Sequence, residues 1–579
     1  MGTKGTEVMR NKPTYIILLV SFALVAHSTL AGSATWNLSP TSGDWTTAAN
    51  WTPGTIPNGP SDVATFATSS KTAISINSIV EVSEIVYSPG ASAFTTTSLS
   101  NLTISGPGIT NNSGIIQNFL VGIDYGAGIL FQNSASAGAQ TVFTVEDNGE
   151  SLGEGQVTFY DTSSGGDATF VTQGGNFADQ TGGIVFFTES SNAGNAVITN
   201  KGRMIDTAEG GGETKFRGSA SAGSATITNE PNGTPLGGGV GGVLTFDESC
   251  TAATSVITNE GATVSGQIGG DTNFYDQSTA DRATIICNGG QVTGAGGGIV
   301  QFIDAASPER ATLIANGGSN GGDGGKIQIL SHPRQSGPRV QIYGNGTLEI
   351  GDGGIILGSL EGSGVVTSGV AVGSNNSSTI FSGTILGSLL QKVGSGTLTL
   401  SGTNIASATV SGGTLIVNGT IGSSFFPTVV SSGTLGGGGV ITSELFVGDS
   451  SGKPAFLAPA AGKRRQSTLT VQQDVFLTGD ATYTYTFRAK GRRTRTDLLV
   501  ADGVTLNSGG SATIDIQGSV QGTLRTGLTL RVISNTSVNP IVGHFSNLAD
   551  GAIVTIGGAK FQANYEGGDG NDLTLTVIP

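Results

Sequence analysis

The sequence has little charge, few cysteines and few histidines, and each shortage excludes a class of protein. Charged residues make up 12% of the 579 residues, roughly half the share of an average domain (~25%). The two cysteines, Cys250 and Cys287, cannot build a disulfide framework, and the three histidines lie too far apart for a zinc site. No GxSxG segment lies at a strand-to-helix turn, as a nucleophile elbow requires, and no glycine-rich phosphate loop is followed by a helix. We therefore expect no catalytic activity and no cofactor.

The charge that is present is mainly acidic. Against 26 basic residues stand 41 acidic ones, which gives a formal net charge of −15. A nucleic-acid backbone needs a basic protein face, so this balance disfavours a nucleic-acid partner. It suits a soluble surface that can attract divalent cations.

Glycine and strand-forming residues are abundant. The chain contains 95 glycines, about twice the usual share (~7%). They do not recur at every third position, which excludes collagen, and glycine at this density disfavours helices. Thr, Val, Ile and Phe alternate with other residues, and no stretch shows a helical apolar stripe. The sequence therefore predicts an all-β protein.

Residues 1–31 have the composition of a secretory signal peptide. Lys4 and Arg10 provide a basic start, residues 16–26 form an apolar run, and small residues follow up to Ala31 and Ala34. The run is shorter than the ~20 residues that a membrane-spanning helix needs. No later segment could span a membrane as a helix. We expect a secreted or cell-surface protein without a transmembrane segment after signal removal.

Residues 32–128 predict an N-terminal cap region built of short β-strands. Trp36, Trp45 and Trp51 lie here in a stretch rich in proline. Large aromatic side chains mostly pack inside proteins, and the open end of a stack of strands needs covering. We expect the three tryptophans to close that end; the alternative is a sugar-binding platform.

Residues 129–356 repeat with a period near 28. One apolar anchor recurs at steps of 28, 28, 29, 30, 28, 28 and 27 residues: Phe131, Phe159, Phe187, Phe216, Phe246, Phe274, Phe302 and Ile329. A second apolar run follows each anchor about eleven residues later, and a Gly pair closes most units. A constant period of this size indicates stacked repeats. We predict a parallel β-helix (β-solenoid) in which the phenylalanines form one internal column.

Two further columns follow from the same register. Asn200, Asn229 and Asn259 end the second strand, with Asn288 and Asn316 one place later; asparagine suits sharp corners and forms hydrogen-bonded ladders. An acidic stripe lies two places after the anchor and should be solvated or bridged by cations: Asp161, Glu189, Glu248, Asp276 and Asp304. The two cysteines occupy different corners, so we expect free thiols.

Residues 390–419 resemble the autotransporter-associated β-strand repeat, also called the passenger-associated transport repeat. The matching residues include Gly394, Gly396, Gly412, Gly413 and Asn418, within residues 357–465, which we expect to continue the β-helix. The resemblance implies a β-helical passenger that is exported and displayed at a bacterial surface. Residues 466–579 look like the last β segment of such proteins and are too few for the membrane barrel that ends autotransporters. The sequence stops at Pro579, so we expect either free secretion or a missing anchor.

Two segments are candidate binding sites. Residues 567–572 resemble one copy of a calcium-binding nonapeptide, with Asp569, Asn571 and Asp572 as the weak candidate ligands; the alternative is a simple turn. A basic cluster lies between strand-like runs and is predicted to be a loop that could hold an anionic ligand: Arg488, Lys490, Arg492, Arg493 and Arg495. Lys463, Arg464 and Arg465 are near it in the sequence.

These observations predict a secreted or cell-surface structural or adhesin-like protein, expected to be a monomer. Extracellular glycans or components of the cell envelope are the expected partners. The alternative is a polysaccharide lyase or hydrolase built on a β-helix. Such an enzyme would need a groove on one face of the helix where acids and bases converge, whereas an adhesin would show a smooth or merely acidic face.

Overall fold

A computed structural model describes residues 32–122, 127–147, 155–176, 181–205, 210–233, 240–330, 337–351, 354–462, 465–491, 493–506 and 512–579. The expected signal peptide, 1–31, lies outside the described residues. The described part of the chain is made of β-strands, with one short 3-10 helix at Ala48–Asn50. None of its helices is long and apolar enough to cross a membrane.

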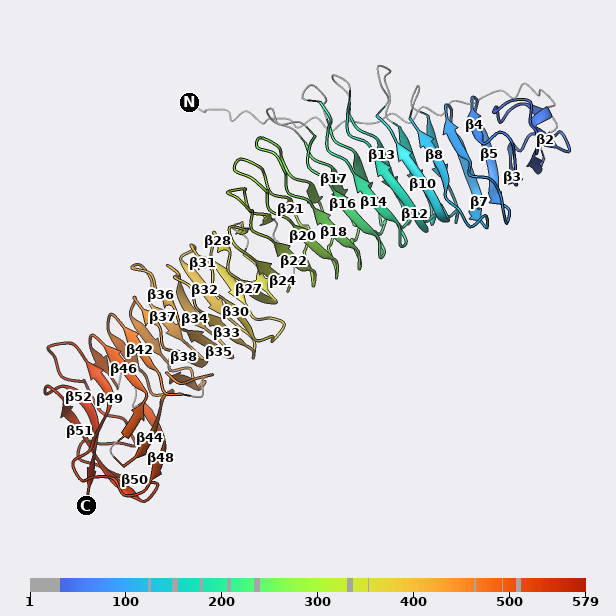
Figure 1. The fold of residues 1–579 in the computed structure, drawn as a ribbon. Helices are drawn as coiled ribbons and strands as arrows, with labels where there is room; N and C mark the ends of the chain where they lie inside the picture. Colours follow the sequence, from blue (N-terminus) through green and yellow to red (C-terminus); the bar gives the residue numbers. More distant parts are fainter. Residues whose placement is uncertain are drawn as a thin grey trace, which may run out of the picture.

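The strands stack into a long, curved β-helix in which each turn of the chain pairs in parallel with the turns before and after it (Figure 1). Two sheets run along most of its length. The first sheet contains, in spatial order, β2 (Trp51–Thr52), β1 (Ala34–Trp36), β3 (Gly59–Phe66), β5 (Val80–Tyr87), β7 (Leu102–Asn111), β9 (Gly128–Phe131), β11 (Gln156–Phe159), β13 (Ile184–Phe187), β15 (Glu213–Phe216), β17 (Val243–Phe246), β19 (Asp271–Phe274), β21 (Ile299–Phe302), β23 (Lys326–Ile329), β25 (Thr347–Ile350), β28 (Val365–Val366) and β31 (Thr384–Ile385).

The second sheet lies opposite the first across the core. It contains β4 (Ala73–Ile76), β6 (Thr95–Ser98), β8 (Gln117–Val121), β10 (Ala139–Val145), β12 (Asp167–Thr172), β14 (Val197–Asn200), β16 (Thr226–Asn229), β18 (Val256–Asn259), β20 (Thr284–Cys287), β22 (Thr312–Ala315), β24 (Arg339–Ile342), β27 (Ser359–Gly362), β30 (Thr379–Phe381), β33 (Thr397–Leu400), β35 (Thr414–Val417), β38 (Gly433–Gly436), β41 (Ala455–Ala458), β44 (Ala481–Lys490), β48 (Thr513–Gln521) and, beside β44, β45 (Arg493–Thr496).

After about residue 355 the stack gains further faces and its turns become shorter. In the second sheet Thr397 pairs with Thr414, and Thr414 pairs with Thr434. The third sheet contains β26 (Ile356–Leu357), β29 (Val370–Val372), β32 (Leu389–Lys392), β34 (Ser407–Val410), β37 (Thr428–Val430), β40 (Leu445–Val447), β43 (Val475–Leu477) and β47 (Val504–Thr505). The fourth contains β36 (Thr420–Ile421), β39 (Val440–Ile441), β42 (Thr468–Val471), β46 (Leu498–Ala501), β49 (Thr529–Asn535), β52 (Asp572–Ile578), β51 (Ala559–Gly567) and β50 (Ile553–Ile556).

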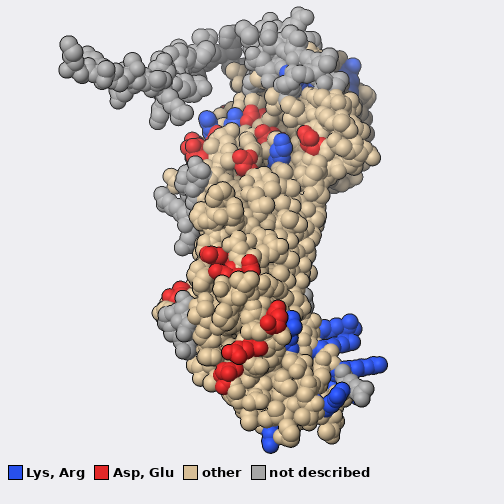
Figure 2. Space-filling model, turned by 90° about the vertical axis from the view of Figure 1, so that its left-hand side faces the viewer, with Lys and Arg blue, Asp and Glu red and all other residues tan. Residues whose placement is uncertain are grey.

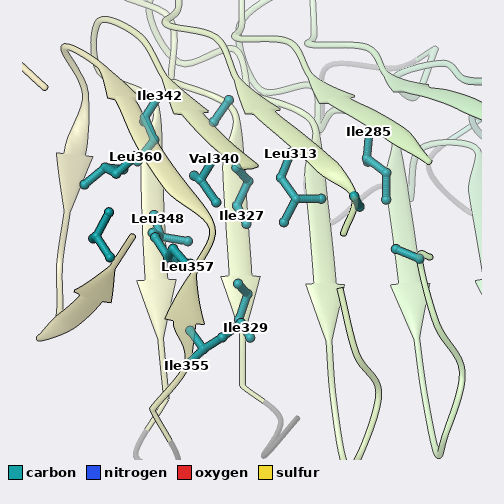
Figure 3. Close-up of a cluster of buried hydrophobic side chains, with 14 of the residues drawn as sticks. Ile285, Leu313, Ile327, Ile329, Val340, Ile342, Leu348, Ile355, Leu357 and Leu360 are labelled. Atoms are coloured by element: carbon teal, nitrogen blue, oxygen red, sulfur yellow. The ribbon is translucent and has the colours of Figure 1, made fainter. Parts of the chain in front are cut away.

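The phenylalanine column is confirmed. Phe131 to Phe302 are buried, and neighbouring rings in the column stack with centroids 4.5–4.8 Å apart. Ile329 pairs with Phe302 and takes the next place. Figure 3 shows the aliphatic continuation of this core, where Leu313, Val340 and Leu360 from successive turns point into the space between the sheets. The period in the sequence thus equals one turn of the helix.

The Gly pairs lie where backbones of neighbouring segments approach most closely. A Cβ atom at Gly242, Gly270 or Gly298 would lie 1.9, 2.1 and 2.2 Å from a carbonyl oxygen of the second strand. Real Cβ atoms do not approach oxygen this closely, so glycine is required there for space. This requirement explains why the pair recurs in almost every turn.

The asparagine ladder is confirmed, but its expected place at a corner is wrong. Asn200, Asn229 and Asn259 are buried strand residues that point inward. The Nδ2 group of Asn200 donates to Oδ1 of Asn229 at 2.8 Å, and that of Asn229 donates to Oδ1 of Asn259 at 2.7 Å. Asn288 and Asn316 form a separate, partly exposed pair. Stacked amides satisfy one another inside the core, so no left-handed corner is needed.

Both ends of the stack are closed. At the N-terminal end Trp36, Trp45 and Trp51 are buried and pack against Phe66, as expected for a cap rather than a sugar platform. At the C-terminal end the parallel ladders continue through β44, β46 and β49 and finish in the antiparallel strands β52, β51 and β50. Cys250 and Cys287 are buried free thiols, as predicted.

Candidate functional site

The basic cluster lies on a β-hairpin formed by β44 and β45. Alternate residues of β44 point inward, as the sequence ATYTYTFRAK requires of a strand with one buried face. The hydroxyl groups of Tyr483 and Tyr485 donate to the carbonyls of Val532 and Arg531 at 3.1 and 3.3 Å. Burial raises the pKa of both tyrosines, so they remain neutral donors. β44 is therefore anchored in the part that precedes its pairing with β45.

The four described basic side chains share the outward face of this hairpin. Arg488 lies opposite Arg495, and Lys490 lies opposite Arg493 in the antiparallel pairing. All four are exposed. The expectation that they lie in a loop is wrong, since they lie on strands whose intervening residues Phe487 and Ala489 are buried. Arg492 lies outside the described residues. We call Arg488, Lys490, Arg493 and Arg495 the basic hairpin face.

Within the described residues, no carboxylate forms an ion pair with the basic hairpin face. Like charges directly opposite each other on paired strands repel. Two such pairs follow one another here, so the face carries an uncompensated positive field. Figure 2 shows basic side chains projecting together from one side of the lower, C-terminal part of the molecule, whereas acidic side chains lie elsewhere in that view.

A groove of about 710 Å³ lies beside this face. Its floor is formed by outward residues of β44 and β48, which pair in parallel. The groove offers two guanidinium groups, hydroxyl and amide groups and the carboxylate of Asp497, which accepts hydrogen bonds from Thr486; its lining also includes Arg465, Gln466, Thr484, Arg488, Gln517 and Ser519. Such a set can bind charged groups and hydroxyl groups of the same ligand.

The calcium-like segment forms the turn between β51 and β52. The Asp572 side chain is buried, accepts a hydrogen bond from the Asn535 N–H at 2.9 Å and pairs with Arg531 at 3.1 Å. Asn571 donates to the carbonyl of Ser537, and Asp569 lies in the turn. In the described part of the chain, no group of three or more His, Cys, Asp or Glu side chains could hold a metal ion. These contacts give Asp572 and Asn571 roles in holding the turn.

The acidic stripe lies at exposed corners with left-handed backbone. The φ angles of Asp161, Glu189, Glu248, Asp276 and Asp304 are between 53° and 60°. Several of these carboxylates accept hydrogen bonds from backbone N–H groups of the preceding turn: Asp161 from Asn133 and Glu189 from Asp161, both at 2.7 Å, and Glu248 from Gly218 at 3.0 Å. The stripe is solvated, as expected, and each N–H donor offsets part of the repulsion between neighbouring acids.

Sequence reasoning missed Lys392, which is fully buried in β32. Its Nζ donates to the carbonyl oxygens of Val393, Gly394 and Gly412 at 2.6, 3.2 and 3.3 Å. Burial lowers the pKa of Lys392 to about 8, while the three carbonyls favour the charged ammonium. In the sequence, a lysine at an inward position of a strand-like run was the signal that could have indicated its burial. Its place beside Gly394 and Gly412 makes it a support for the turns of the 390–419 segment.

Comparisons with known proteins place few constraints on this chain. No protein-family model matches it, and no curated protein matches it. Among solved structures, the crystal structure of the Haemophilus influenzae Hap adhesin matches with 12% sequence identity and a TM-score of 0.27. The match covers 90% of this chain and 64% of that chain, so this chain spans less than two thirds of that structure. The resemblance of residues 390–419 to the autotransporter-associated repeat stays a prediction.

Proposed function

We propose that this protein is a secreted or cell-surface structural protein of the adhesin type, which binds anionic glycans of the cell envelope or extracellular matrix through the basic hairpin face. The long β-helix acts as a stiff spacer, because each turn is fixed by its neighbours on both sides. The ligand-binding surface lies near its C-terminal end.

The observation that carries this proposal is the arrangement of Arg488 opposite Arg495 and Lys490 opposite Arg493. Facing like charges lower the stability of a hairpin, and an anion between them removes that cost. A polymer with regularly spaced carboxylates or sulfates can contact both pairs at once. Each Arg can hold such a group through two parallel N–H donors. The adjacent groove adds hydroxyl and amide groups for the uncharged parts of a sugar.

Several carboxylates of the β-helix are held by hydrogen bonds or ion pairs, which supports a binding role rather than a catalytic one. Corner carboxylates accept backbone N–H groups, as described above. On the outward side of the first sheet Glu213 pairs with Lys215 of the same strand at 3.2 Å, and just after β15 and β17 Arg217 pairs with Asp247 at 3.4 Å. A polysaccharide lyase or hydrolase needs an acid and a base that are free to face one bound sugar.

The test is binding of the purified chain to a polyuronate and to dextran sulfate at low salt. The variant Arg488→Ser/Arg493→Ser/Arg495→Ser should lose affinity at least roughly tenfold, about 1.4 kcal/mol. The difference should fade above ~0.3 M salt, where the Debye length falls below ~6 Å. Uncharged dextran should not bind to either protein.

The matched control is Arg282→Ser/Arg310→Ser/Lys326→Ser, which removes the same number of charges from the β-helix body. This control should keep wild-type affinity. If both variants weaken binding equally, the effect is one of net charge and the basic hairpin face is not the site. If neither weakens it, the proposal is wrong. Release of new reducing or unsaturated sugar ends by the wild-type chain would favour the enzyme instead.

A further inference from the structure

The groove beside the basic hairpin face is lined by three neighbouring segments. Within the second sheet β44 lies between β41 and β48, and outward residues of β44 and β48 form the floor (Figure 1). The end of β41 and the residues after it add the methyl groups of three half-buried alanines, Ala458, Ala460 and Ala461. The groove therefore combines a polar floor with a small apolar wall, which we call the alanine wall.

Several polar groups of the groove are available to a ligand. Among the described residues, the side chains of Gln466, Thr484 and Ser519 have no hydrogen-bond partner in the protein. Gln517 uses its Nε2 group to donate to Oδ2 of Asp515 at 2.7 Å, and no described residue donates to its Oε1 atom. These groups include amide N–H donors, carbonyl oxygen acceptors and hydroxyl groups. A ligand in the groove can therefore both donate and accept hydrogen bonds.

The positive charge of the groove is concentrated where it meets the basic hairpin face, because Arg488 belongs to both. The other charged residues of the described lining are Arg465 and Asp497, which are of opposite sign. Asp497 is fully buried, and its carboxylate accepts hydrogen bonds from Thr486. An anionic group of a ligand is therefore favoured at Arg488, and a neutral group is favoured in the rest of the groove.

We propose that the groove holds the acetamido group of an N-acetylated amino sugar, so that the glycan carries N-acetylated sugars next to acidic ones. This inference rests on the proposed function of the basic hairpin face and names the class of glycan. An acetamido group has one N–H donor, one carbonyl acceptor and one methyl group. The free amide and hydroxyl groups of the groove match the first two, and the alanine wall matches the methyl group.

Other substituents of acidic glycans match this groove less completely. An O-acetyl ester has the methyl group and the carbonyl but no N–H donor. The hydroxyl group of an unsubstituted sugar leaves the alanine wall without an apolar partner. The groove volume of about 710 Å³ lies within the range of ligand pockets, roughly 300–1,000 Å³, so it has room for a sugar together with its substituent.

The experiment compares the binding of the purified chain to two uronate polymers that differ by one methyl group in each repeat. The first is hyaluronan, which carries N-acetyl groups, and the second is the same polymer with N-formyl groups in their place. Both have the same charge, so the contribution of the basic hairpin face is equal. The wild type should bind hyaluronan about fourfold more tightly, which corresponds to the burial of one methyl group. The variant Ala460→Leu fills the groove and should bind both polymers with equal affinity.

The matched control is Ala305→Leu, which adds the same side chain at an exposed corner of the β-helix and should keep the fourfold preference. A second variant, Gln466→Leu, removes an amide from the groove. It should weaken the binding of both polymers and leave the binding of polyuronate unchanged. The urea unfolding midpoint of each variant checks that it is folded.

The outcomes separate this inference from the proposed function. Equal binding of the two polymers by the wild type overturns the inference, and so does a preference that Ala460→Leu retains. If the wild type binds polyuronate but shows no such preference, the basic hairpin face stays the binding site and the acetamido group is wrong. If the wild type binds none of the three polymers, the proposed function fails and this inference fails with it.

Discussion

Lys392 shows how one buried charge links this fold to pH. The pKa of its ammonium falls from the usual 10.5 to about 8 in the folded chain because the group is buried. Between pH 8 and pH 10.5 the unfolded chain therefore binds more protons than the folded one, and the free energy of unfolding rises with pH. The rise is at most about 3 kcal/mol. Below pH 8 both states are charged, so the free energy of unfolding no longer depends on this group's titration and the cost of burying its charge is fully present.

We expect Lys392→Met to remove this rise. The variant should be less stable near pH 7, because three carbonyls lose their donor. The measurement is the urea unfolding midpoint of both proteins at several pH values between 7 and 10.5. Their difference isolates Lys392, because the thiols, with pKa values that burial raises to about 12, are common to both. An identical pH profile for the two proteins would contradict the assignment.

Single residues were the hardest to predict from the sequence. The ladder of Asn200, Asn229 and Asn259 was predicted from its register, but its burial was not, because asparagine is usually found at the surface. Amides can enter a core only when each finds a partner in the next turn, and this condition depends on three-dimensional stacking. Lys392 escaped notice for the same reason.

At the scale of the element, the Gly pairs decide how tightly the turns can pack. We expect Gly270→Ala to lower the free energy of unfolding by about 2–4 kcal/mol, because the new methyl group would lie 2.1 Å from the carbonyl oxygen of Asn229. Gly210→Ala is the control, since its Cβ would lie 3.8 Å from Thr181, an ordinary contact distance. The test is the unfolding midpoint in urea. Equal effects of the two changes would show that packing space is not what selects glycine.

The strands themselves were largely predictable, and the basic cluster less so. A 28-residue period, the Phe anchors and the second apolar run together predict two or three strands in each turn, and the structure has two in the repeats from Phe131 to Phe302. The basic cluster was assigned to a loop because it lies between two strand-like runs of the sequence. In the structure the alternation of Phe487, Arg488, Ala489 and Lys490 continues the strand past the core, with the arginines and lysines outward. The alternation of inward and outward residues over 481–490, taken without regard to charge, predicts a strand that extends to Lys490.

The whole molecule faces a problem common to stacked strands, which is that each open end can pair with another chain. The N-terminal end is closed by β2, which pairs antiparallel with β1, and by the buried side chains of Trp36, Trp45 and Trp51. Trp45 Nε1 donates to the carbonyl of Pro57 at 2.9 Å, and Trp51 Nε1 donates to that of Trp45 at 2.7 Å. These hydrogen bonds hold the segment between Trp45 and Pro57 over the first turn of the β-helix.

We expect Trp45→Ala/Trp51→Ala to open this end and to make the protein associate end to end as its concentration rises. Sedimentation velocity at several concentrations measures this association. The control is Phe216→Ala, which removes a buried aromatic ring from the middle of the column at a cost of about 3–5 kcal/mol but leaves the end closed. If both variants associate, the association results from a general loss of stability and not from an open end. A monomeric Trp variant would show that β2 alone closes the stack, whereas association of the Trp variant only would establish that the cap keeps this β-helix a single molecule.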